Sequence, residues 1–313
     1  MMMARRNTYM RSRCGICLLV VGLLARSGYA AQPPSPSRVT ILYDAFGDRA
    51  GLTRDWGFAA LVEYRGHRIL FDTGNNAEIF AANIRALHVN LRTIDFVVVS
   101  HRHGDHTAGI NYLLQVNPRV KIYAPREGFG VFGAALPGTF YRADTALPGR
   151  MRYFDGQPPG ELRFGTPWPK ANVMLVDSLT EVVPGAFIIA TVSETPGTLE
   201  LRELSLALQT SEGMVLLVGC SHPGIETILT ASRPVADRVH LILGGLHLVT
   251  TPDTEIERIT TSLHDQWHVR RIAPGHCTGE PAFAALQRIF GEAYVYAGLG
   301  TIIELPSTRR DGA

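Results

Sequence analysis

Three histidines and one aspartate gather within six residues of this 313-residue chain. His101, His103, Asp105 and His106 closely follow the apolar run Phe96-Val97-Val98-Val99. Imidazole and carboxylate groups are ligands that suit zinc, iron and manganese. So many ionisable groups at the end of a buried strand would be costly without a cation to compensate them. Because these six residues hold three of the chain's 11 histidines, a solvated loop with chance histidines is the weaker interpretation.

The order of these donors indicates two metal ions. In an extended loop alternate side chains point the same way, so His101 and His103 face one centre. A turn at Gly104 lets Asp105 and His106 face a second centre. We therefore expect a pair of divalent metal ions, with zinc favoured and manganese or iron as alternatives.

Three later motifs place histidine and cysteine after apolar runs. They are Gly219-Cys220-Ser221-His222, Gly244-Gly245-Leu246-His247 and Pro274-Gly275-His276-Cys277. All three histidines should reach the same cavity, and His247 is then a ligand, a general acid, a substrate contact or a hydrogen-bonded structural residue. Each cysteine lies beside a histidine, so proximity to metal and a disulfide both stay open. For Cys277 a buried thiol is the favoured interpretation.

Hydrophobic spacing predicts the elements that position these motifs. Strands are expected at residues 39–43, 58–64, 68–71, 94–99, 173–176, 186–191, 204–208, 214–218, 239–243 and 271–273. Helices are expected at residues 77–87, 107–116, 224–231, 253–264 and 282–290. Strands and hairpins followed by strand–helix alternation predict an α/β protein with two sheets covered by helices. The stretch 125–169 is rich in glycine, proline and aromatic residues and is expected to be an insertion or a substrate-facing lid.

The histidine-rich run resembles the His-x-His-x-Asp-His signature of the metallo-β-lactamase superfamily. Leu70-Phe71-Asp72-Thr73-Gly74 resembles the first motif of that superfamily. The resemblance covers nearly the whole chain after its N-terminus. It implies a four-layer αββα sandwich with metals at the sheet edges. It also implies that Asp72 braces the metal loops from behind the ligands.

A narrower resemblance points to the branch named after 7,8-dihydropterin-6-methyl-aminobenzene-phosphate synthase. The segments that carry it are Asp55-Trp56-Gly57-Phe58, Gly219-Cys220-Ser221-His222-Pro223-Gly224, Gly244-Gly245-Leu246-His247 and Pro274-Gly275-His276-Cys277-Thr278-Gly279. This set of motifs is specific to the branch, whose members are functionally diverse. The branch implies a phosphorylated, pterin-like ligand.

The chain departs from a typical superfamily member at two ligands. Such a member has a histidine ligand in mid-chain and a bridging aspartate at a later strand end. Here no histidine occurs between His106 and His222, and Cys220 stands where the aspartate is expected. We therefore expect Cys220 to lie behind the ligands in a site that is less anionic than usual. The predicted ligands are His101, His103, Asp105, His106, His222 and His276.

The N-terminus has the features of a signal peptide. Five arginines and no acidic residue fall among its first 30 residues, and the apolar run 14–25 precedes small residues around Ala30-Ala31. We expect a signal peptide at 1–31, a flexible leader at 32–37 and one domain at 38–306. An uncleaved membrane anchor is the alternative. The mature protein is then periplasmic or secreted.

Charge argues against a nucleic-acid partner. Without those five arginines the chain carries 25 basic and 28 acidic residues, which gives no basic patch by charge alone. A small-molecule substrate is expected, with no membrane span after cleavage; the sequence leaves the oligomeric state open.

Together these features predict an exported metal-dependent hydrolase of a small phosphoester, cyclic ester or lactam. Asp105 would orient the nucleophile and accept its proton, and His247 would protonate the leaving group. An iron-dependent redox enzyme on the same fold and a non-catalytic metal- or ligand-binding protein are the alternatives.

Overall fold

The computed structural model describes residues 36–126, 135–163, 168, 170–198 and 200–307. They all fall in one compact unit, Pro34–Ala313. The expected signal peptide at 1–31 lies outside the described residues, as does most of the expected leader. Among the described helices, none is both long and apolar enough to cross a membrane.

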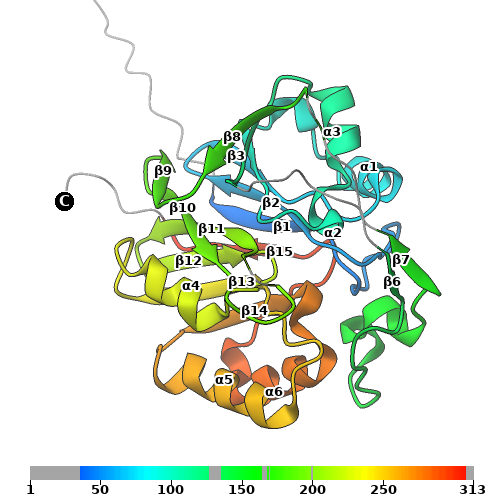
Figure 1. Cartoon of the computed structure of the whole chain (residues 1–313), viewed down its shortest axis with the longest axis vertical. Coiled ribbons are helices and arrows are strands. Elements are labelled where there is room, and N and C mark those ends of the chain that lie inside the picture. The colour runs from blue at the N-terminus through cyan, green and yellow to red at the C-terminus, as the bar shows by residue number, and fades with distance from the viewer. Residues whose placement is uncertain (1–35, 127–134, 164–167, 169, 199, 308–313) are drawn as a thin grey trace, which may run out of the picture. The chain divides into compact units, whose positions relative to one another are not determined.

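The first sheet has seven strands in the order β15-β1-β2-β3-β4-β5-β8 (Figure 1). Antiparallel pairing joins β15, β1, β2 and β3, and parallel pairing joins β3, β4, β5 and β8. The β2–β3 pair is the expected hairpin. The strands are β1 (Arg38–Tyr43), β2 (Ala59–Tyr64), β3 (His67–Phe71), β4 (Phe96–Val98), β5 (Lys121–Pro125), β8 (Asn172–Val176) and β15 (Ile302–Glu304).

The second sheet has six strands in the order β14-β13-β12-β11-β10-β9. Its β9 to β12 part is antiparallel, and β12, β13 and β14 are parallel. The parallel strands are joined by helices, as a parallel crossover requires. The strands are β9 (Thr180–Val183), β10 (Ala186–Val192), β11 (Arg202–Thr210), β12 (Gly213–Val218), β13 (Val239–Gly245) and β14 (Arg271–Gly275).

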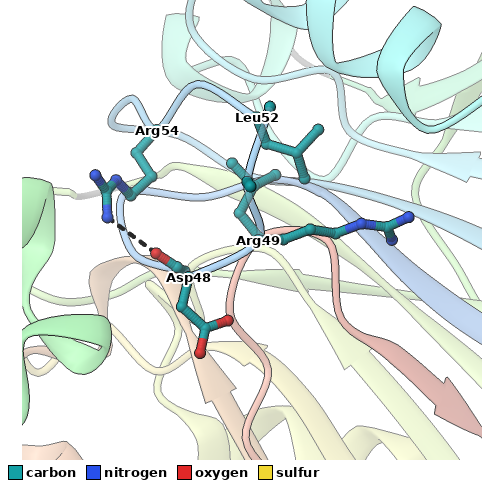
Figure 2. Close-up of a pocket in the computed structure, with 8 residues that line it drawn as sticks. Asp48, Arg49, Leu52 and Arg54 are labelled. Carbon is teal, nitrogen blue, oxygen red and sulfur yellow. Dashed lines mark hydrogen bonds between the residues drawn. The ribbon is translucent and has the colours of Figure 1, made fainter.

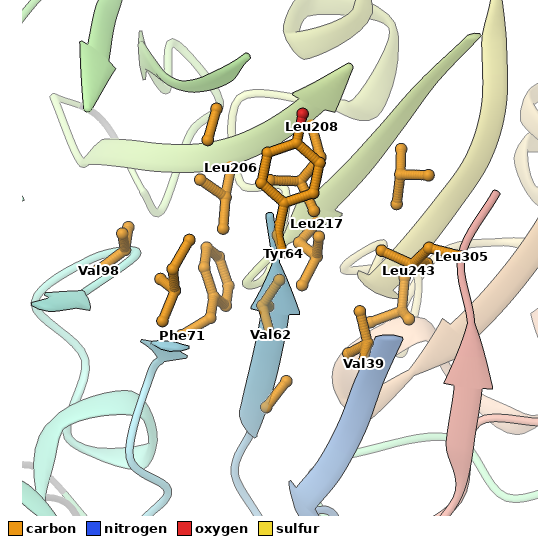
Figure 3. Close-up of a cluster of buried hydrophobic side chains, with 14 of the residues drawn as sticks. Val39, Val62, Tyr64, Phe71, Val98, Leu206, Leu208, Leu217, Leu243 and Leu305 are labelled. Atoms are coloured by element: carbon orange, nitrogen blue, oxygen red, sulfur yellow. The ribbon is translucent and has the colours of Figure 1, made fainter. Parts of the chain in front are cut away.

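The two sheets pack face to face through an apolar core (Figure 3). Val62 and Phe71 of the first sheet contribute to the same buried cluster as Leu206, Leu217 and Leu243 of the second. A second cluster joins the first sheet to α1 (Ala77–Ala86) and α3 (Ile110–Val116). A third joins the other sheet to α4 (Ile225–Ser232), α5 (Asp253–Asp265) and α6 (Glu280–Phe290). The expected four-layer αββα sandwich is confirmed.

The segment expected as an insertion is only partly described. Its described residues include a two-stranded sheet of β6 (Ala135–Pro137) and β7 (Glu161–Arg163). Between these strands lie the short 3-10 helices η2 (Gly149–Met151) and η3 (Tyr153–Gly156). The first residue of the segment, Pro125, belongs instead to β5 of the main sheet.

One expected helix begins in the wrong place. The sequence predicts a helix over 107–116, but the structure has a helical turn α2 (Gly104–Thr107) followed by α3. The Ala108 N–H donates to the carbonyl oxygens of Gly104 and Gly74, so tertiary contacts fix this turn. Asp105 and His106 therefore lie on α2, which begins at Gly104, where the sequence analysis expected a turn. The sequence analysis also missed β5, β9 and β15, which are short. β5 and β15 are held by pairing with strands distant in sequence, and β9 pairs with the neighbouring β10.

Replacing Tyr64 by phenylalanine tests how strongly the two sheets are tied together. The Tyr64 hydroxyl group, on β2, contacts the carbonyl oxygens of Gln209 at 2.7 Å and Gly185 at 3.1 Å, across the core. Removing one buried hydrogen bond and leaving a carbonyl unsatisfied should lower the free energy of unfolding by about 1–3 kcal/mol. Urea denaturation of Tyr64→Phe measures the change. Tyr123→Phe, in the same sandwich, is the control; equal stability of the two variants would contradict the assignment.

Candidate metal centre

The predicted site residues lie at the carboxyl ends of five strands. These ends meet because β3 pairs in parallel with β4, and β12 and β14 each pair in parallel with β13. In open α/β sheets this edge is where ligands bind. The residues that follow the five strands are, in chain order, Asp72, His101, Cys220, His222, His247 and His276.

Four residues at these strand ends have a left-handed backbone. The φ angles are 56° at Asp72, 65° at Ser221, 52° at His247 and 47° at His276. A residue other than glycine costs on the order of 1–3 kcal/mol in this region and persists only where its surroundings hold it there. The strand ends are therefore shaped for the site and not for local backbone stability.

A first donor group consists of His101, His103 and His222. One ring nitrogen from each lies within 4.8 Å of the others. His101 Nε2 and His103 Nδ1 are 3.1 Å apart, and the His222 ring lies 4.7 Å from the His101 ring and 4.8 Å from the His103 ring. Three imidazoles that converge in this way can hold one metal ion.

A second donor group consists of Asp105, His106 and His276. The Nε2 atoms of His106 and His276 are 3.1 Å apart. Asp105 Oδ2 lies 3.3 Å from His276 Nε2 and 3.8 Å from His106 Nε2. The structure thus brings the six predicted ligands together in two groups of three.

Asp72 orients one histidine of each group. Its Oδ2 accepts from His106 Nδ1 at 2.7 Å and from the Ser100 hydroxyl at 2.7 Å. The Ser100 oxygen in turn lies 2.8 Å from His101 Nδ1. Both histidines therefore carry a proton on Nδ1 and direct Nε2 toward the donor groups, as in carboxylate–histidine–metal arrangements. Its position behind these histidines is the one implied for Asp72 by the sequence motif.

Glu203 plays the same part in the second sheet, and sequence reasoning missed it. Its buried carboxylate accepts the backbone N–H groups of Cys220, Ser221 and His222 at 2.7–2.9 Å. It also contacts His222 Nδ1 at 3.0 Å, which leaves Nε2 as the free donor atom. Burial opposes ionisation of Glu203, but these hydrogen bonds outweigh it and hold its pKa at about 2. A carboxylate so bound fixes both the turn and the His222 ring.

Asp44 positions the last histidine through the backbone. Its Oδ2 accepts the His276 N–H at 3.0 Å, and its Oδ1 accepts the Ala45 N–H at 2.7 Å. Burial raises the Asp44 pKa to about 7 against the opposing charge of His276. Asp44 therefore has a definite structural role beside the site.

Electrostatics in the cluster favour neutral imidazoles in the first group. Burial, followed by repulsion from His106, moves the pKa of His101 well below its usual value. Burial likewise lowers the pKa of His103 to about 4. For His106 burial also opposes the charge, but the Asp72 and Asp105 carboxylates raise its pKa to about 9. A cation bound between the two groups would take the place of the proton that the Asp72 and Asp105 carboxylates attract to His106.

This donor set fits divalent metal ions. Because His106 Nδ1 is committed to Asp72, Nε2 is the atom that would bind a cation, which would displace its proton. That atom faces His276 Nε2 and Cys220 Sγ, each 3.1 Å away. Buried lone pairs that face one another at this distance are compensated when a metal ion lies among them.

The cysteines and His247 complete the inner surface. Cys220 and Cys277 are free, buried thiols, and the Cys277 thiol lies 3.7 Å from the Cys220 carbonyl oxygen. The structure therefore does not have the disulfide that the sequence left open. The half-buried His247 ring lies 4.2 Å from the His222 ring, and within the described residues its Nδ1 has no hydrogen-bond partner.

Aromatic residues cover the side of the second group. The Trp56 ring lies 5.3 Å from the His276 ring, is stacked on Tyr141 at 5.4 Å and meets Tyr153 edge-on at 4.7 Å. Tyr141 and Tyr153 come from the segment 125–169, so its described part packs beside the centre. Whether the segment acts as a lid stays a prediction.

A separate pocket of about 190 Å³ lies between residues 47–54 and Leu299 (Figure 2). Its arginines are engaged with the main chain, since Arg54 donates to the Gly47 carbonyl oxygen at 2.9 Å and Arg49 donates to the Gly300 carbonyl oxygen at 3.0 Å. The predicted ligands are not among its lining residues. This pocket is therefore separate from the candidate metal centre.

Comparison with known proteins agrees with this geometry. The model of the family described as the metallo-beta-lactamase superfamily matches residues 53–199. The chain is 28% identical over 295 residues to the 7,8-dihydropterin-6-methyl-4-(beta-D-ribofuranosyl)-aminobenzene-5'-phosphate synthase of Methanocaldococcus jannaschii, with 85% of this chain and 95% of that protein covered. A solved metal-dependent hydrolase of the beta-lactamase superfamily is 26% identical, with a TM-score of 0.66 and coverage of 87% of this chain and 100% of that chain. A metallo-beta-lactamase fold protein from Bacillus subtilis, 14% identical, shares the fold with a TM-score of 0.53 over 86% of this chain and 99% of its own.

Replacing Glu203 by glutamine tests its role behind the first donor group. The glutamine amide has one acceptor oxygen where the carboxylate has two. Its NH₂ group would face the backbone N–H groups of residues 220–222, which are also donors. Metal affinity should fall by about 10- to 100-fold, the usual effect of losing such an orienting residue. Isothermal titration with zinc measures the affinity. The control is Glu212→Gln, whose carboxylate is half-exposed and pairs with His240; a Glu203→Gln protein with unchanged affinity would refute the role.

Proposed function

This chain belongs to the metallo-β-lactamase superfamily of metallohydrolases, and on that premise we propose that it hydrolyses a small phosphoester, cyclic ester or lactam with the help of two divalent metal ions. Zinc is the proposed metal, because five of the six predicted ligands are imidazoles. The proposal includes all six predicted ligands. It also includes export of the mature protein.

The observation that carries the proposal is the pair of adjacent donor groups. The His101 and His106 rings, one from each group, are 4.2 Å apart. Five of the six donors are buried and His103 is half-buried, and carboxylates behind the groups hold His106 and His222. Such pairing of donor sets is the arrangement found in two-metal hydrolytic sites.

When bound, metal ions at these donors would lower the pKa of water toward 7 and polarise the oxygen of the bond under attack. Asp105 stays ionised, because His106 and the other histidines around it outweigh the effect of burial and hold its pKa well below the usual value. Its carboxylate can accept a hydrogen bond from water and so orient the nucleophile. A carboxylate held so strongly in its ionised form is a weaker base than the sequence analysis supposed.

His247 is the proposed proton donor to the leaving group. It lies beside His222, is partly exposed, and within the described residues its Nδ1 atom has no partner. Its left-handed backbone directs it to this position at the end of β13. A titratable ring with an uncommitted nitrogen at the edge of the centre suits general acid catalysis.

Phosphoesters are the first substrate class to test. The archaeal relative is named for a product with a 5'-phosphate group, and it aligns with 85% of this chain. An exported enzyme would meet other substrates than a pterin pathway supplies, so lactones and β-lactams follow in the same panel.

Replacing His103 or Asp105 by alanine removes one donor from one group. Hydrolysis of the preferred substrate should fall by more than about 100-fold in both variants, beyond the 10- to 100-fold expected from an outer residue. Turnover over the panel and metal content by plasma emission spectrometry are measured together. His67→Ala, whose ring pairs with Asp95 at the surface, is the control. Near-normal rates in either active-site variant would remove its residue from the proposed centre.

The proposed export is testable by fusion of residues 1–37 to a reporter that is active only outside the cytoplasm. The apolar run after the arginines should direct the reporter across the membrane, with cleavage near Ala30-Ala31. N-terminal sequencing of the exported protein locates the cleavage site. Deleting residues 14–25 is the control that should abolish export, and a reporter that stays in the cytoplasm with the full segment would contradict the proposal.

A further inference from the structure

Cys220 lies between the two donor groups, which share no residue with each other. Its Sγ atom is 3.1 Å from His106 Nε2 of the second group. It also lies within 4.8 Å of donor atoms of His101 and His222 in the first group and of His276 in the second. Cys220 is the one residue that joins three of the described donor clusters.

The charges of the donor groups leave room for another anion. The first group offers three imidazoles and the second offers one carboxylate, that of Asp105. Two divalent ions would therefore face a single negative ligand. Asp72 and Glu203 are also ionisable, but their oxygens are engaged with Ser100, with His106 and with the turn behind the donors. A thiolate between the groups would add negative charge where both ions are near, and metals deprotonate coordinating thiols.

The backbone holds Cys220 in this position. It follows β12, and its N–H donates to Glu203 Oε1 at 2.9 Å. The side chain is 2% exposed and forms no disulfide. Glu203 thus fixes both Cys220 and His222. The turn directs His222 into the first donor group and Cys220 toward His106 of the second.

Cys277 differs from Cys220 although both are buried. Its thiol contacts the Cys220 carbonyl oxygen at 3.7 Å, and it occurs in only one of the donor clusters. It does not lie between the two groups of three. Cys277 also contacts the side chains of Cys220 and His247, but it belongs to neither group of three. It therefore provides a control: a second thiol in the same surroundings that lies outside both groups.

We infer that the Cys220 thiolate is a metal ligand shared by the two donor groups, in the place where a bridging carboxylate would otherwise stand. The inference rests on the metal-dependent hydrolase proposed above. It gives the centre a soft donor, so the centre prefers zinc and cobalt to manganese. Replacing the thiol by a carboxylate should move this preference toward manganese.

The experiment is titration of the full chain with Co²⁺ alone, followed by absorption spectroscopy. The wild-type protein and Cys277→Ser should bind about two Co²⁺ and show sulfur-to-cobalt charge-transfer absorption in the near ultraviolet. Cys220→Ser should lose this absorption, and Cys220→Asp should bind cobalt without it and bind Mn²⁺ at least 10-fold more tightly than wild type. Absorption that survives Cys220→Ser, or that disappears only in Cys277→Ser, overturns the inference.

A measurement on unmutated protein keeps the test independent of folding. Zinc-edge X-ray absorption of the zinc-loaded wild type should show a sulfur neighbour at about 2.3 Å, and Cys277→Ser should retain it. Zinc bound by nitrogen and oxygen alone refutes the shared thiolate while leaving the proposed hydrolase intact. Failure of the wild type to bind Co²⁺ or Zn²⁺ overturns the proposed function itself, so the two failures are distinguishable.

Discussion

The buried Asp72 carboxylate is the contact on which the site depends. It is fully removed from solvent at the end of β3, where an isolated charge would be very costly. Ser100 N–H, the Ser100 hydroxyl and His106 Nδ1 offset that cost with hydrogen bonds of 2.7 Å. The same bonds hold the loop after β4 against β3 and select the tautomer of two histidines. The Asp72 carboxylate therefore determines both the position of the loop after β4 and the histidine nitrogens that face the metal site.

Glu203 and Asp44 repeat this principle at the other strand ends. Glu203 binds the 220–222 turn, and Asp44 binds the backbone of His276. Each carboxylate compensates its own burial with backbone donors, so the strained turns that present the donors are held from behind. The positive φ angles of Ser221 and His276 are sustained by these contacts. The result is a rigid set of donors on two sheets that the apolar core holds at a fixed separation.

Sequence reasoning recovered the sheets and most helices because their apolar periodicity is local. It missed β15 and β9, which depend on pairing with β1 and β10. It also missed Glu203. In β11 the residues Leu204 and Leu206 face the inter-sheet core, so Glu203 belongs to the alternate face, where a charge suggests solvent. Only the turn that folds over that face makes Glu203 a buried residue.

The sequence by itself determined which side chains could do chemistry, because three histidines and an aspartate within six residues form a local pattern that can be recognised without the fold. It also determined the layered α/β class, since the spacing of apolar residues that distinguishes strands from helices is a local property of the sequence. Only the tertiary structure decided how the donors group. His106 and Cys220 are 114 positions apart, yet their side chains are 3.1 Å apart. That proximity arises from parallel strand pairing within each sheet and from packing between the sheets, which are contacts that no local pattern encodes.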